Sequence, residues 1–171
     1  MKWERLKKEV LFPSLETLLN DCKPGDLNFL KLSNATGISR TTLYFHYETI
    51  NDAFIDLLQY FEQELQNRLA KGNDSENSRD DLMTVLLFVR DNYELLKVVK
   101  KIYHLRPIGN DLRSTVRAIV LSSLIEDSSN CGEFEVTFVW NGFVGVIRKW
   151  LNEGCVTAPE DIHASLILRK I

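Results

Sequence analysis

One short stretch of the sequence collects side chains that could contact a nucleic acid. Between Leu27 and Tyr47 there is no Asp or Glu, although these acids make up 24 of the 171 residues. A surface that approaches phosphates must lack carboxylates, because each would repel the nucleic-acid backbone at close range. Cations, hydroxyls and one imidazole fill the stretch instead, on Lys31, Ser39, Arg40, Thr41, Thr42, Tyr44 and His46. Such groups suit phosphate contacts, and the arginine fork also matches O6 and N7 of guanine.

Residue sets for catalysis or metal binding are missing from the sequence. There is no glycine-rich phosphate loop, no nucleophile elbow and no His-Glu-x-x-His motif. The paired carboxylates at 80–81 and 160–161 lie in a polar stretch and at a helix start, where solvation and the helix dipole explain them. His104 and His163 lack metal-ligand spacing to each other or to any cysteine. We therefore predict no enzyme, no metal and no cofactor.

Two short helices must position the acid-free stretch. Helices are predicted over 28–35 and 39–46, joined by a Thr-Gly-Ile-Ser connection. Gly37 can end the first helix because glycine adopts positive φ cheaply, and Ser39 can cap the start of the second. The spacing also allows four apolar residues to pack across the turn, namely Leu32, Ala35, Ile38 and Leu43. This pattern is a helix-turn-helix signature, although tight helical corners that bind no DNA share it.

Hydrophobic spacing predicts helices along the rest of the chain as well. The longest begins at Ile50 and places apolar residues on one face as far as Leu69. Before it, a helix is predicted over 3–19, which Pro13 can break in two. After it, helices are predicted over 82–93, 95–103, 112–124, 134–151 and from 159 onward. No alternating run requires a sheet, so the predicted fold is all-α.

Composition and charge describe a soluble globular chain. Apolar residues make up 44% and charged residues 26%, and no apolar run approaches the roughly 18 residues of a membrane span. Three scattered cysteines argue against a disulfide framework, so the reducing cytoplasm is the predicted location. The net charge is −3, and residues 1–50 carry seven basic and six acidic side chains. This is a weak electrostatic footprint for a DNA-binding head.

The segment 32–47, with the long amphipathic helix behind it, resembles the DNA-binding head of the TetR family of transcriptional regulators. The resemblance over 27–54 depends on the Gly-Ile-Ser turn and the Thr-Leu-Tyr-x-His-aromatic motif. A second segment, 139–151, is similar to the dimerisation helix of some members. The resemblance implies a head at 1–49, whose third helix enters the major groove. It also implies a helical domain at 50–171 that dimerises and often binds a small-molecule effector.

Carried over to this sequence, the family motif implies a set of DNA contacts. Arg40 would read base edges, and Thr42 and His46 would touch phosphates. The full predicted set is Lys31, Ser39, Arg40, Thr41, Thr42, Tyr44, Phe45 and His46. Tyr44 and Tyr47 could instead belong to the core of the head. Many family members begin the fourth helix with a phosphate-binding lysine, and this chain has Ile50 there.

Helical spacing in the second domain predicts two further sets of residues. Gly142 and Gly145 lie one turn apart and would let a neighbouring backbone approach closely. With them, the predicted dimer interface comprises Phe138, Gly142, Gly145, Val146 and Trp150, and packing within one chain is the alternative. The predicted effector pocket comprises Phe61, Phe88, Tyr93, Tyr103, Trp140 and Phe143, which would serve equally well as ordinary core.

Together these features predict a homodimeric, cytoplasmic transcriptional repressor that binds a two-fold operator in double-stranded DNA. A small-molecule effector could release it by changing the spacing between the two heads. The alternative is a degenerate family member with weak or no DNA binding that acts through protein–protein contacts. The weak charge of the head and Ile50 favour that alternative. A small-molecule enzyme is a third and more distant hypothesis.

Overall fold

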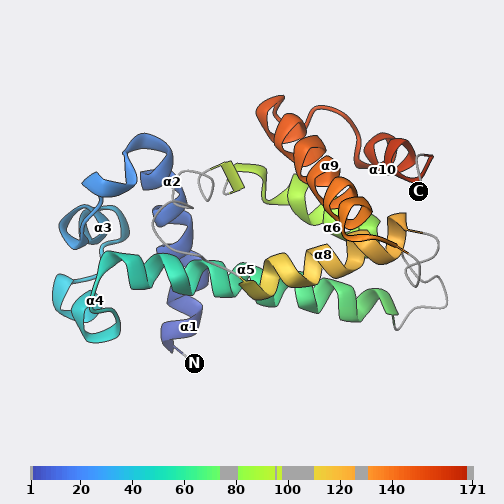
Figure 1. Ribbon diagram of the computed structural model, residues 1–171. Coiled ribbons are helices and arrows are strands. Elements are labelled where there is room, and N and C mark those ends of the chain that lie inside the picture. The colour runs from blue at the N-terminus through green and yellow to red at the C-terminus, as the bar shows by residue number, and fades with distance from the viewer. Residues whose placement is uncertain (1, 74–80, 95, 98–109, 126–130, 169–171) are drawn as a thin grey trace. The chain divides into compact units, whose positions relative to one another are not determined.

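The structure is a computed structural model that describes residues 2–73, 81–94, 96–97, 110–125 and 131–168. Every regular element in these ranges is a helix, which confirms the predicted all-α fold (Figure 1). The predicted helix over 95–103 lies almost wholly outside the described residues. The α-helices are α1 Lys2–Leu6, α2 Phe12–Asp21, α3 Phe29–Thr36, α4 Arg40–His46, α5 Ile50–Asn73, α6 Asp81–Asp91, α8 Asn110–Leu124, α9 Glu133–Asn152 and α10 Pro159–Ile167.

The described chain divides into two compact units. Residues 2–61 form the first unit, and the described residues from 62 onward form the second. Helix α5 belongs to both, because its first half lies in the first unit and its second half in the second. The domain division between residues 49 and 50 remains a proposal.

The N-terminal helix continues through Pro13. Between α1 and α2 the backbone forms a π-helical turn over Lys7–Leu11, and the N–H of Phe12 donates to the carbonyl oxygen of Lys7, five residues earlier. Pro13 has no N–H and cannot make the next helical hydrogen bond. The wider turn at this point accommodates the proline. Of the two possibilities that Pro13 left open, the unbroken helix is the one found, and it runs on to Asp21.

The core of the first unit lies where α2, α3 and α4 meet. Helix α3 packs against both α2 and α4. Leu32, Ile38 and Leu43 are buried together at the turn, as their spacing predicts. Ala35, predicted to join them, is exposed on the outer side of α3. Leu43 is fully buried at the middle of α4, so burial of this side chain holds the short helix onto the unit.

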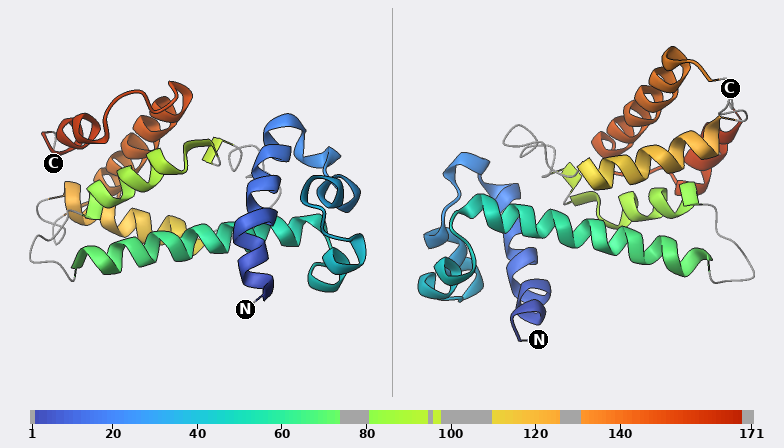
Figure 2. Two further views of the ribbon diagram at one scale, coloured as in Figure 1. Left: turned by 180° about the vertical axis from the view of Figure 1, so that it is seen from behind. Right: turned by 60° about the horizontal axis from the view of Figure 1, so that its bottom comes forward.

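The second unit is a bundle of α6, α8, α9 and α10 with the end of α5. Helix α8 packs on α6 and α9, and α10 packs on α6 and α8, so the four group together in both views of Figure 2. Arg68 of α5 binds Asp91 of α6 at 2.8 Å and Glu64 at 3.0 Å, with its guanidinium over the Phe88 ring. These contacts join the second half of α5 to α6.

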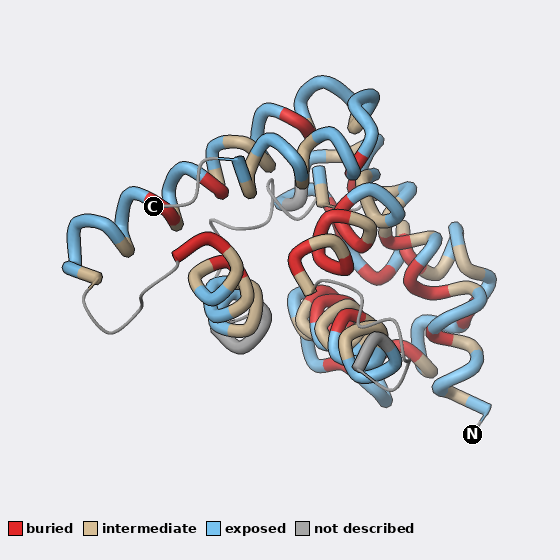
Figure 3. Tube along the Cα trace, turned by 90° about the vertical axis from the view of Figure 1, so that its right-hand side faces the viewer, coloured by how far each residue is buried: buried red, intermediate tan, exposed pale blue. Residues whose placement is uncertain are grey.

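Helix α9 is covered on one side only. In Figure 3 it projects to the left and is mostly pale blue, with short red segments where it meets its own bundle. The buried positions are Val139, Phe143 and Trp150. The long side facing away from the bundle is exposed, and its first two turns carry Phe134 and Phe138.

Candidate nucleic-acid interface

The connection between α3 and α4 is formed by three local features. Gly37 ends α3 in the left-handed region at φ 71°, and its N–H donates to the carbonyl oxygen of Ser33 at 2.9 Å. The Thr36 hydroxyl accepts from the N–H of Ile38 at 3.1 Å. The Ser39 side chain accepts from the N–H of Thr42 at 3.1 Å and so caps α4. These contacts fix the angle between the two helices and confirm the predicted helix-turn-helix.

Helix α4 presents an outer face that is free for a ligand. Arg40 and Thr41 are exposed, and among the described residues neither makes a hydrogen bond or an ion pair. Tyr44 is 61% exposed and Phe45 is 83% exposed, so two aromatic rings share this face. Tyr44 also packs edge-on against Phe29, with the ring centroids 4.7 Å apart. No acidic residue lies in α4, so the face combines a cation, hydroxyls and aromatic rings without a carboxylate.

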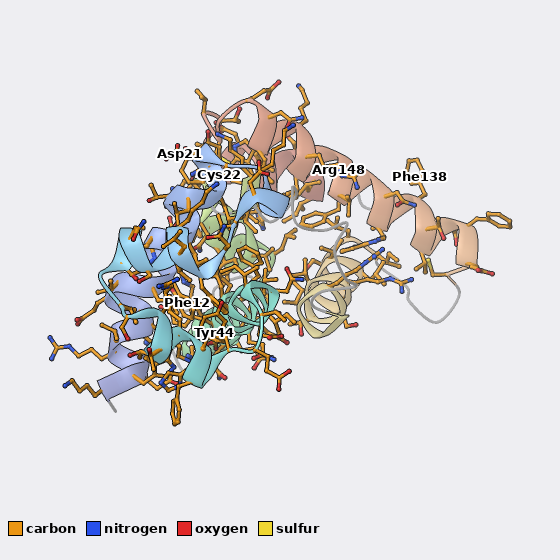
Figure 4. All side chains as sticks on the ribbon, turned by 90° about the vertical axis from the view of Figure 1, so that its left-hand side faces the viewer. Phe12, Asp21, Cys22, Tyr44, Phe138 and Arg148 are labelled. Atoms are coloured by element: carbon orange, nitrogen blue, oxygen red, sulfur yellow. The ribbon has the colours of Figure 1, made fainter. Side chains whose placement is uncertain are left out.

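Two members of the predicted set have structural roles, and one lies apart. The hydroxyls of Ser39 and Thr42 bond each other at 2.8 Å at the start of α4. The ammonium of Lys31 lies 3.9 Å from the sulfur of Cys22, at the turn between α2 and α3. Figure 4 labels Cys22 well away from Tyr44, so Lys31 does not join the α4 residues.

A partly buried charge cluster joins the end of α4 to the N-terminal helix and to α5. Tyr47, which follows α4 and is buried, donates its hydroxyl proton to Asp56 of α5. Lys7 binds the other oxygen of the same carboxylate at 3.0 Å and Glu4 at 2.8 Å. Burial alone would lower the pKa of Lys7, but the hydrogen bonds to Glu4 and Asp56 outweigh it and raise that pKa. Burial, with the hydrogen bond to Asp56, raises the pKa of Tyr47.

The last residue of α4 is in contact with the first turn of α1. The rings of Trp3 and His46 stack with centroids 3.7 Å apart and planes only 5° apart. Phe45 meets the same imidazole edge-on at 5.0 Å, and Tyr47 lies 6.0 Å from Trp3. Sequence analysis did not predict the part played by Trp3, Lys7 or Asp56. The available signal was weak: Trp3 and Lys7 are four residues apart, which places them on one side of a helix.

The predicted dimer residues divide between the exposed and the buried side of α9. Phe138 is 67% exposed and projects from α9 away from α8 in Figure 4. Gly142 and Gly145 are exposed as well, and Val146 is half-buried. Trp150 is only 1% exposed, and its indole N–H donates to the carbonyl oxygen of Thr157 at 2.9 Å. The face open to a partner therefore excludes Trp150, and it gains Phe134, which is 92% exposed.

The predicted pocket residues have several different environments. The rings of Trp140 and Phe143 are in contact, with Arg113 over the Trp140 ring at 5.7 Å. Phe88 is buried beneath Arg68, and the Tyr93 hydroxyl bonds Lys97 at 2.7 Å. Phe61 belongs to the first unit and its ring packs edge-on against Tyr60. Tyr103 lies outside the described residues.

No group of three or more His, Cys, Asp or Glu side chains in the described ranges is arranged to hold a metal ion. No helix in those ranges is both long and apolar enough to cross a membrane.

The fold and the α4 face define a class: a helical protein that pairs a helix-turn-helix unit with a separate helical bundle. Residues 76–168 match the family described as transcriptional regulator C-terminal region, of the TetR type. This match covers more than half of the chain, and the chain belongs to the TetR family of transcriptional regulators. No similar protein was found among curated proteins or among solved structures. The matched region does not overlap the head motif at 27–54, so the two likenesses support the family separately.

Proposed function

We propose that this transcriptional regulator binds double-stranded DNA through α4 and does so as a homodimer that represses transcription. The observation that carries the proposal is the outer face of α4, where Arg40 is exposed and unpaired among the described residues and no carboxylate lies nearby in the helix. An unpaired guanidinium can read guanine without first breaking an ion pair. Each head would occupy one half-site of a two-fold operator.

The proposed contacts fall into two classes. Arg40, Thr41, Tyr44 and Phe45 would face base edges and sugars, because their side chains are exposed on α4. The N-terminus of α4, with Ser39, and the imidazole of His46 at its other end would meet phosphates. Lys31, whose ammonium lies beside Cys22, would support the contacts from the preceding helix α3. Thr42 would take part in these contacts through its backbone and its shared hydrogen bond with Ser39.

The exposed side of α9 is the proposed dimer interface. Phe134 and Phe138 place two large apolar rings in solvent on successive turns, and Gly142 and Gly145 continue the same side without a Cβ. At each glycine a Cβ would meet nothing within 4 Å, so the open space is available to a neighbouring helix. A second copy would present the same face, as two-fold symmetry requires. An effector pocket in the second unit remains part of the proposal.

A selection from random duplex DNA, performed with the full chain, tests the DNA-binding proposal. We expect an enriched palindrome whose binding weakens with salt by about 0.9 log units per log unit for each neutralised phosphate. Arg40→Ala should cost about 1–3 kcal/mol and relax the sequence preference. Arg90→Ala removes the same charge from α6 in the second unit and is the matched control, with no expected change of preference. No enrichment at low salt, from a folded protein, would refute DNA binding.

A protein partner for the head is the second candidate function. The exposure of Tyr44 and Phe45 favours it, because aromatic side chains are enriched at protein interfaces. The same selection decides between the two candidates. If the folded chain enriches no duplex even at low salt, DNA binding is refuted and the protein-partner candidate is the one that stands.

A further inference from the structure

The imidazole of His46 is held from one side by the N-terminal helix. The Trp3 ring stacks on it with centroids 3.7 Å apart and nearly parallel planes, and the Phe45 ring lies perpendicular to it at 5.0 Å. Among the described residues neither ring nitrogen of His46 makes a hydrogen bond or an ion pair. A histidine ring carries at least one N–H donor, and this donor lies in the plane of the ring. The stack therefore fixes the plane in which His46 can donate.

Trp3 is linked to the charge cluster through its own helix and through Tyr47, whose ring centroid lies 6.0 Å away. Lys7 lies one helical turn after Trp3 and binds Asp56, and Asp56 accepts from Tyr47, the residue that follows His46. The Trp3–His46 stack completes a ring of five residues, in which Lys7 and Tyr47 both bind Asp56. These five residues connect the first turn of α1 to the end of α4 through a ring stack and through partly buried, charge-assisted hydrogen bonds.

We propose that Trp3 is a positioning residue for DNA binding, which holds the His46 imidazole so that its N–H donates to a phosphate oxygen at the end of α4. This inference rests on the proposed function. An exposed histidine free to rotate would have to be ordered when DNA binds, and that ordering costs side-chain entropy. In this head the stack orders the ring in advance. Trp3 touches no DNA in this scheme and acts only through His46.

A double-mutant cycle tests the dependence of Trp3 on His46. The variants are Trp3→Leu, His46→Ala and the two combined, and the probe is the duplex enriched in the random selection. His46→Ala should weaken binding about tenfold, the low end for a hydrogen bond to a charged group. Trp3→Leu should weaken it by about three- to tenfold when His46 is present and by less than about twofold when His46 is absent.

Two further variants separate positioning from general packing. Trp3→Phe keeps a ring that can stack on His46, so its affinity should stay within about twofold of the parent protein. Tyr60→Leu is the matched control, because Tyr60 packs on Phe12 and Lys8 of the same N-terminal helix without touching His46. Any loss it causes should be the same with and without His46. Circular dichroism on each variant confirms that the helices are intact.

Each outcome decides the proposal. If Trp3→Leu costs the same factor in both backgrounds, or if Trp3→Phe binds as poorly as Trp3→Leu, the positioning role is overturned while DNA binding stands. If the parent protein binds no duplex, the proposed function and this inference fall together. A loss that disappears when His46 is absent, and that Trp3→Phe restores, establishes the role.

Discussion

Replacing Gly37 with alanine should lower the free energy of unfolding of the head, and backbone strain alone should cause the loss. Gly37 has φ 71°, and a Cβ added there would meet nothing within 4 Å. A steric clash is therefore excluded, and the cost comes from the left-handed conformation, about 1–2 kcal/mol for a residue with a side chain. Alanine also reduces the freedom of the unfolded chain, which returns about 0.4–1 kcal/mol. The net loss of stability should be about 1 kcal/mol.

Gly25→Ala provides a control that shares everything except the backbone conformation. Gly25 lies in the same unit, a Cβ there also meets nothing within 4 Å, and its φ is outside the left-handed region. The unfolded-chain contribution is the same for both variants and cancels when they are compared. Gly25→Ala should therefore be more stable than Gly37→Ala by the strain alone, about 1–2 kcal/mol.

Amide hydrogen exchange in α4 measures this difference directly. The N–H groups of Leu43 and Tyr47 donate to the carbonyl oxygens of Ser39 and Leu43, so they exchange when α4 opens. A difference of 1–2 kcal/mol corresponds to about 5- to 30-fold in the exchange rate of these amides. Equal exchange rates in the two alanine variants would refute the assignment of strain to Gly37.

Three further substitutions test one hydrogen bond in each unit and the exposed face of α9. Tyr47→Phe removes the hydroxyl that Asp56 accepts from, and it should cost about 1–3 kcal/mol at neutral pH in chemical denaturation. Because the pKa of Tyr47 is raised on folding, its stabilisation is complete below about pH 10 and is lost as the pH rises further, so Tyr47→Phe should flatten the alkaline decline of the unfolding free energy. Phe138→Ser should shift a dimer toward monomer in size-exclusion chromatography with light scattering, and an unchanged mass would contradict the α9 interface. Trp150→Phe leaves the Thr157 carbonyl without its donor and should lower the unfolding free energy by about 1–3 kcal/mol, with the oligomeric state the same as in the parent protein.

The helix-turn-helix could be predicted because its signals are local. Gly37 and Ser39 act on backbone groups within three or four residues, so the residue types alone indicate where α3 ends and α4 begins. Leu32, Ile38 and Leu43 are likewise close in sequence, and their spacing predicts their burial. The helices of the second unit follow from apolar periodicity in the same way.

Contacts between residues far apart in the sequence could not be predicted from such local patterns. Trp3 and His46 are separated by 43 positions, and periodicity gives the face of a helix without naming what it meets. Trp150 was assigned to the exposed side of α9 although it is buried, and helix geometry explains why. A helix turns about 100° per residue, so Trp150 lies about 120° around the axis of α9 from Phe138. Gly142 and Gly145, in contrast, lie within about 40° of Phe138. A pattern read over more than three turns therefore joined an exposed side to a buried one.

The π-helical turn over Lys7–Leu11 determines where the N-terminal helix can change length and still keep Trp3 on the His46 ring. Such a turn holds an extra residue, and deletion of any one residue inside it would restore ordinary α geometry. The wide turn absorbs that residue, so the helix before it would keep its orientation relative to α2. Deletion of one residue from the ordinary α-helical turns of α2 would instead rotate everything before it by about 100° and carry Trp3 off the His46 ring. A chain shortened there could retain Trp3 and His46 unchanged and still lose their contact.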